Sequence, residues 1–125
     1  MKTPALLLSL SLLASTAGAQ EVDALQRATQ AGCLACHAVE SAARNANGLP
    51  SVGPSFEAVA ARYKSLKGAQ QQLTAAVMGG TGAQAHHWQG QLGSVAMPPN
   101  QVALSEADAA QIVAWILSIE PLVHN

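Results

Sequence analysis

Apolar side chains recur along this chain at spacings of three and four residues, the period of an amphipathic α-helix. No segment alternates with period two, so we expect an all-α fold without a significant strand. Cap and stop signals divide the pattern into four helices: about 22–36, about 55–63 after a Ser55 cap, 69–78 before Gly79-Gly80, and about 105–119 before Pro121.

Two of these helices show a clear apolar face. The last opens on Ser105-Glu106-Ala107-Asp108, which has the form of a capping box. Its predicted buried stripe is Ile112, Trp115, Ile116 and Ile119. In the first helix, Leu25, Ala28 and Gly32 recur at spacings of three and four and are predicted to share one face.

Two long segments separate the helices, from Ala38 to Gly53 and from Gly79 to Leu104. A structureless loop beyond about 15 residues is unusual in a compact domain unless it binds something. Disordered surface loops are the alternative, but Trp88, Leu92 and Met97 make the second segment too apolar for that. We therefore expect both loops to wrap around a bound group.

The first residues have the pattern of a secretory signal peptide. Met1-Lys2 supplies a charged start, an apolar run follows to Ala14, and Ala17-Gly18-Ala19 forms a small-residue cleavage site. An uncleaved membrane anchor is the alternative, although the apolar run is short for a bilayer. We assign residues 1–19 to the signal and residues 20–125 to a single exported domain, with no stable membrane insertion after cleavage.

The composition of residues 20–125 provides few large apolar side chains for a core. Alanine supplies 22 of these 106 residues, and the aromatic side chains are only Phe56, Tyr63, Trp88 and Trp115. Alanine buries little apolar area, so a chain of this length would close a core alone with difficulty. A large apolar cofactor would fill that deficit.

The charge pattern excludes a nucleic-acid partner. Without Lys2 the chain has five basic and seven acidic residues, a net charge of −2, and no basic stripe. Arg62, Lys64 and Lys67 form the only basic cluster. We interpret it as a solvated helix end, with partner binding as the alternative.

Cys33-Leu34-Ala35-Cys36-His37 is the strongest chemical signal, because C-x-x-C-H is the attachment signature of c-type haem. On one helical turn the two thiols can add to the two haem vinyl groups, and the adjacent imidazole can bind the iron. A redox C-x-x-C usually stands in a βαβ context, and a zinc site needs further ligands that no other Cys supplies. A Cys33–Cys36 disulfide would leave His37 without a role.

A haem iron bound by His37 has a sixth coordination position, and Met97 is the best candidate for the ligand there. Pro98 forces Met97 out of the α region, and Pro99 stiffens the loop, so a weak thioether ligand is held at little entropic cost. A core methionine is the alternative interpretation of Met97. The other candidate ligands are Met78, which ends a helix, and His86, His87 and His124.

These features together resemble a short bacterial monohaem class I cytochrome c. The resemblance rests on C-x-x-C-H at 33–37, Val52-Gly53-Pro54, Trp88, Met97-Pro98-Pro99-Asn100, the Ser105 capping box and Ala114-Trp115-Ile116-Leu117-Ser118. They cover nearly all of residues 20–125 in the family's order. The resemblance implies about four helices around one covalently attached haem c, and electron transfer in the periplasm without substrate chemistry.

The resemblance also implies individual roles. The Pro54 carbonyl would accept a hydrogen bond from the outer N–H of His37, and the Trp88 indole N–H would point at a haem propionate. A helix-start proline and a core tryptophan are the corresponding structural alternatives. Trp115 would pack the last helix across the first. The family often has an aromatic residue on the first helix at this contact, whereas this chain has Ala28. The two helices would therefore lie closer together or pack more weakly.

Two segments depart from the family pattern. We interpret Arg44 to Gly48 as an insertion that lengthens the segment between His37 and Pro54. His86-His87 stands beside Trp88, and we interpret these histidines as exposed loop residues, with a propionate contact as the alternative.

Three functions are compatible with the sequence. We expect a soluble, monomeric one-electron carrier in a respiratory chain, which meets a donor dehydrogenase or cytochrome complex and an acceptor oxidase or reductase. The second is a haem-bearing subunit of a larger dehydrogenase or oxidase complex. The third is a haem enzyme with a labile sixth ligand, against which Met97 argues.

Overall fold

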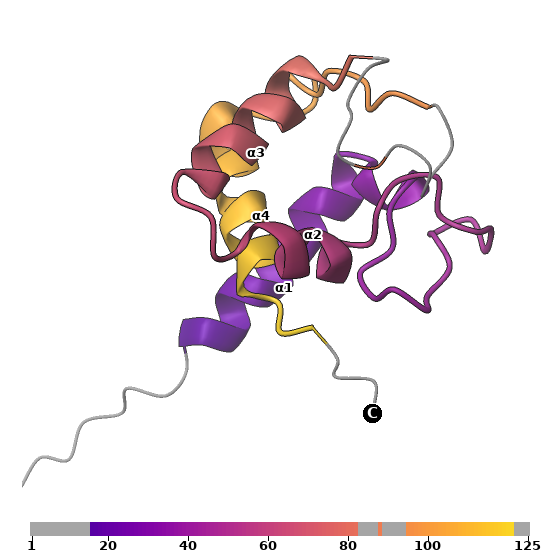
Figure 1. Cartoon of the computed structure of the whole chain (residues 1–125), viewed down its shortest axis with the longest axis horizontal. Helices are drawn as coiled ribbons and strands as arrows, with labels where there is room; N and C mark the ends of the chain where they lie inside the picture. Colours follow the sequence, from indigo (N-terminus) through magenta and orange to yellow (C-terminus); the bar gives the residue numbers. More distant parts are fainter. Residues whose placement is uncertain (1–15, 83–87, 89–94, 122–125) are drawn as a thin grey trace, which may run out of the picture.

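The computed structural model describes residues 16–82, 88 and 95–121, and within these ranges the chain is helical without strands (Figure 1). The all-α prediction is therefore confirmed. The elements are α1 (Thr16–Gln30), the 3₁₀ turn η1 (Cys33–Ala35), α2 (Phe56–Tyr63), α3 (Ala69–Gly79) and α4 (Glu106–Ser118).

Helix α1 differs from its predicted range of 22–36 at both ends. It begins at Thr16, before the predicted cleavage point after Ala19, and it ends at Gln30. Gly32 follows with a φ of 80°, a left-handed conformation that glycine adopts without steric cost and that stops an α-helix. Gly32 is therefore exposed and outside the helix whose face it was predicted to share, and the two cysteines stand on a separate turn.

The other helices begin and end close to the predicted residues. The Ser55 side chain accepts a hydrogen bond from Ala58 N at 3.1 Å and so caps α2. Gly80, at a φ of 74°, follows the last residue of α3. The Ser105 hydroxyl accepts from Asp108 N at 3.1 Å, which confirms the predicted cap of α4.

The core lies where α4 meets the other helices (Figure 1). The predicted stripe of α4 is buried or partly buried, with Ile112 at 2% exposure. Phe56 of α2 meets Trp115 edge to face, with ring centroids 5.6 Å apart. Towards α1 the core is lined by Ala24 and Ala28, which is fully buried. The first and last helices thus pack through small side chains.

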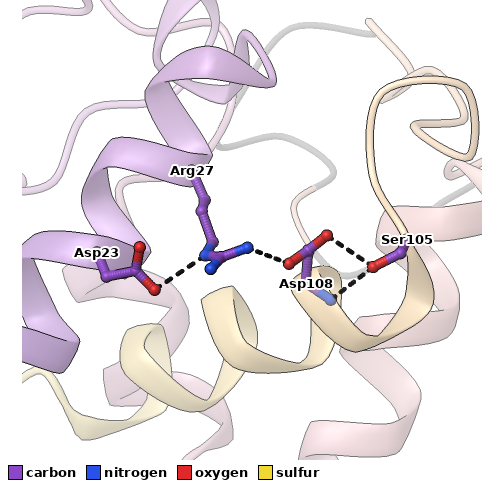
Figure 2. A network of polar contacts seen from close by, with 4 residues as sticks. All are labelled: Asp23, Arg27, Ser105 and Asp108. Atoms are coloured by element: carbon purple, nitrogen blue, oxygen red, sulfur yellow. Dashed lines mark hydrogen bonds and ion pairs between the residues drawn. The ribbon is translucent and has the colours of Figure 1, made fainter.

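A polar network ties α1 to the start of α4 (Figure 2). The Arg27 guanidinium donates to Asp23 at 2.9 Å within α1 and reaches across to Asp108. The other Asp108 oxygen accepts from the Ser105 hydroxyl at 2.6 Å. The Ser105 hydrogen bond and the Arg27 charge both lower the pKa of the Asp108 carboxyl.

Among the described residues, no helix has both the length and the apolar character needed to cross a membrane.

Candidate functional site

The two cysteines of the C-x-x-C-H motif lie at the short turn η1, Cys33 as its first residue and Cys36 as the residue that ends it. Cys36 N and His37 N both donate to Cys33 O, at 3.2 and 3.0 Å, so the motif forms one closed turn after α1. Both sulfurs are free thiols; Cys33 is half-buried and Cys36 is exposed. Burial raises the pKa of the Cys33 thiol. The turn therefore presents two unpaired thiols, as haem attachment requires.

The His37 ring is oriented by two neighbours. Its Nδ1 lies 2.6 Å from the Pro54 carbonyl oxygen, and its face stacks on Phe56 with centroids 5.5 Å apart. A carbonyl only accepts, so Nδ1 carries the proton and Nε2 keeps a free lone pair. Burial lowers the pKa of His37 and so favours the neutral ring, although the Pro54 contact opposes this. A neutral, oriented imidazole is the form that binds a metal.

Gly53 makes room for the His37 ring. A Cβ atom at Gly53 would lie 2.5 Å from His37 Cε1 and 2.7 Å from Nδ1, closer than any ordinary contact. The backbone passes this close because Val52 N and Gly53 N both donate to Cys36 O, at 3.0 and 2.9 Å. The Val52-Gly53-Pro54 segment is therefore packed directly on the motif.

The loop of residues 38–53 returns from η1 to α2 along one side of the molecule (Figure 1). It is anchored to the start of α2, where Ser41 N donates to the buried Glu57 carboxylate at 2.8 Å. The predicted insertion, Arg44 to Gly48, is folded against η1: Ala46 N donates to Leu34 O at 2.8 Å. The sequence pattern alone missed this contact.

The Met97 loop is fixed on the end of α3. Met97 N donates to the Thr81 hydroxyl and Thr81 N donates to Met97 O, both at 2.9 Å. The Asn100 side chain donates to Val77 O at 3.2 Å and to Pro98 O at 3.0 Å. Met97 is half-buried in this fixed loop, which is the rigidity that Pro98 and Pro99 predict.

Met78 has a different environment from Met97. It lies within α3 and packs, partly buried, against the core cluster of α1 and α4. This position agrees with the core-packing role expected for it.

Trp88 is half-buried and contacts α2. The central carbon of the Arg62 guanidinium lies 5.1 Å from the centroid of the Trp88 rings, within cation–π range. Both residues line a cavity of about 450 Å³. The basic cluster is exposed, as expected, but Arg62 meets this aromatic ring and Lys64 pairs with Glu120 at 2.8 Å. The exposure of all three residues agrees with the interpretation of the cluster as a solvated helix end.

The described part of the chain bears on the candidate metal ligands only in part. Among the described residues, no group of three or more His, Cys, Asp or Glu side chains is placed to hold a metal ion. His86, His87 and His124, the candidate histidine ligands, lie outside the described residues.

The sequence profile of the cytochrome c family matches residues 22–120. The chain belongs to the cytochrome c family. Cytochrome c-551 of Allochromatium vinosum is 40% identical over 93 residues, which are 74% of this chain and 81% of the relative. Cytochrome c-551 of Pseudomonas aeruginosa is 34% identical over 108 residues, or 86% of each chain. The crystal structure of Nitrosomonas europaea cytochrome c552 is similar at a TM-score of 0.59 and 32% identity, over 77% of this chain and 99% of that one.

Membership of this family establishes haem c, covalently bound, as the cofactor and electron transfer as the function at the family level. The chain fits the cofactor: it has two free thiols at the required spacing and a neutral imidazole with a free Nε2. The expected small class I cytochrome c fold is likewise confirmed.

Proposed function

We propose that this protein is a periplasmic one-electron carrier whose haem is attached through Cys33 and Cys36 and bound axially by His37 and Met97. The observation that carries the proposal is the His37 geometry, with Nδ1 on the Pro54 carbonyl at 2.6 Å and Nε2 free. Gly53 and Phe56 confine the His37 ring, so the ring is already oriented as an iron ligand before the haem binds.

Each residue of the site has a separate task. Cys33 and Cys36 would form the two thioether bonds, and the Pro54 carbonyl would keep His37 electron-rich by accepting a hydrogen bond from its Nδ1–H. Met97 would present its sulfur from the loop fixed by Thr81 and Asn100. The haem supplies reversible one-electron chemistry at its iron. A methionine ligand favours the ferrous state and a positive potential.

Trp88 would direct its indole N–H at a haem propionate. The Arg62 contact supports this role, because a guanidinium over the ring face restrains the ring while leaving the in-plane N–H free to donate. Removal of residues 1–19 on export would leave a periplasmic domain that meets its redox partners by brief collisions.

Mass spectrometry of the unfolded exported chain, made in a host that matures c-type cytochromes, tests attachment and processing together. We expect one haem on a polypeptide beginning at Gln20, and a redox titration that follows a single one-electron step. A mass without haem would refute the attachment. A haem-bearing chain that begins at Met1 would refute only the cleavage.

Replacement of single ligands separates the roles. Cys33→Ser and Cys36→Ser should each leave a single thioether bond, and His37→Ala should remove the proximal ligand. Ser51→Ala is a control in the loop that packs on the motif, because the buried Ser51 hydroxyl has no hydrogen-bond partner. A normal absorption spectrum in the His37 variant would contradict the assignment of the proximal ligand.

A further inference from the structure

Three backbone carbonyls of the attachment turn are held by the loop that follows it. Leu34 O accepts from Ala46 N at 2.8 Å, and Ala35 O accepts from the Asn45 side-chain Nδ2 at 2.9 Å. Cys36 O accepts from Val52 N and Gly53 N. Since α1 has already ended at Gln30, no later helical turn is available to satisfy these carbonyls. The loop takes the place of that turn.

Asn45 is at the centre of this arrangement. It is only 7% exposed, within the predicted insertion. Its Oδ1 accepts from Asn47 N and Leu49 N, both at 3.0 Å. Backbone N–H groups can only donate, so this oxygen assignment is fixed and Nδ2 must face Ala35 O. The Asn45 amide therefore joins the folded insertion to the C-x-x-C-H turn.

We propose that Asn45 is a positioning residue for Cys36 and His37. The inference rests on the proposed function, because it gives this amide a task in holding the haem ligands. The Ala35 carbonyl belongs to the peptide plane before Cys36, and the Cys36 carbonyl belongs to the plane after it. Asn45 holds the first plane, while Val52 and Gly53 hold the second.

Cys36 needs such support from its backbone. Its side chain is exposed, so packing does little to fix it, and its φ of −113° and ψ of −25° lie at the edge of the helical region. His37 is the next residue, and its Nδ1 reaches Pro54 only if the peptide plane between Cys36 and His37 is correctly oriented. Loss of the Asn45 amide should therefore loosen the hydrogen bond from His37 to Pro54.

Asn45→Asp is the sharpest test variant. The aspartate keeps an oxygen for Asn47 N and Leu49 N but replaces the donor to Ala35 with an acceptor, so the insertion can still fold while its link to η1 is lost. Asn47→Ala is the matched control, because Asn47 is an exposed asparagine of the same loop. Both variants are studied as the haem-bound protein, with haem content confirmed by mass.

The readouts are the exchange rate of the His37 Nδ1 proton, measured by NMR in the ferrous protein, and the reduction potential. Asn45→Asp should speed the exchange about tenfold, the factor expected for the loss of an ordinary hydrogen bond. The potential should rise, because a less engaged imidazole donates less electron density to iron. Asn47→Ala should leave both unchanged. A lowered melting temperature in Asn45→Asp, with His37 exchange and potential unchanged, would overturn the inference.

The wild-type protein provides a second test that needs no variant. The Asn45 Nδ2 protons should exchange with water about tenfold more slowly than those of exposed Asn47. Equal rates would overturn the inference even if Asn45→Asp fails to fold. A wild-type protein without haem would instead refute the proposed function, and the inference with it.

Discussion

Replacing Gly53 with alanine should destabilise the protein by acting on His37. The new Cβ would lie 2.5 Å from His37 Cε1, whereas carbon atoms normally approach to about 3.5–4.0 Å, so the ring or the loop must move by about 1 Å. Gly53 is not among the glycines with positive φ, and the effect is therefore steric and not conformational. Overpacking costs about 1–3 kcal/mol, and a weakened His37–Pro54 hydrogen bond adds about 1 kcal/mol. We expect a total loss of about 2–4 kcal/mol.

Equilibrium unfolding of the haem-bound protein in guanidinium chloride measures this loss. Gly48→Ala is the control, because Gly48 has a φ of 73° but open space around its Cβ position. It should cost about 1–2 kcal/mol through backbone strain alone and leave the reduction potential unchanged. The reasoning is refuted if Gly53→Ala costs no more than Gly48→Ala and its potential equals that of the wild type.

Three further predictions concern the iron ligand, the acid stability and the core. Met97→Ala should abolish the ferric sulfur-to-iron absorption band, lower the potential and admit carbon monoxide, while Met78→Leu should do none of this; the reverse pattern would make Met78 the ligand. Because the neighbouring hydroxyl and guanidinium of Figure 2 lower the pKa of Asp108, its stabilising effect should be present at neutral pH and lost as the pH falls below about 4. Asp108→Asn should therefore lower the midpoint of unfolding in guanidinium chloride more at pH 7 than at pH 3. An equal reduction at both pH values would contradict the stabilising role of the network. Ile112→Ala should cost about 2–5 kcal/mol of unfolding free energy, because Ile112 is 2% exposed, whereas Val102→Ala, at a residue 96% exposed, should stay within about 0.5 kcal/mol.

Local signals in the sequence were sufficient to predict where most helices begin and end. Ser55 and Ser105 cap α2 and α4 as predicted, because a hydroxyl and the N–H three residues later are close in any helix start. The stripe of α4 is buried because an apolar face can only be satisfied against the rest of the chain. The contact of His37 with Pro54 has the geometry that the family resemblance implies.

Contacts that depend on the tertiary fold were not predictable in the same way. The apolar periodicity predicted that the first helix continues through Gly32, because such a pattern does not indicate that a residue adopts a left-handed φ. The buried role of Asn45 depends on carbonyls of η1 ten residues away along the chain, and an Arg-Asn-Ala-Asn-Gly run is otherwise typical of an exposed loop. Arg62 likewise meets Trp88 across a long sequence separation.

The start of α1 at Thr16 has an electrostatic consequence for processing. The first turn of this helix contains no acidic residue in the full chain. Cleavage after Ala19 would remove that turn and bring Glu21 and Asp23 to the new beginning of the helix. Carboxylates there interact favourably with the helix dipole, by about 0.3–1 kcal/mol each, and offset the new terminal ammonium group. Signal removal would thus convert a helix start without acidic residues into one with compensating charge.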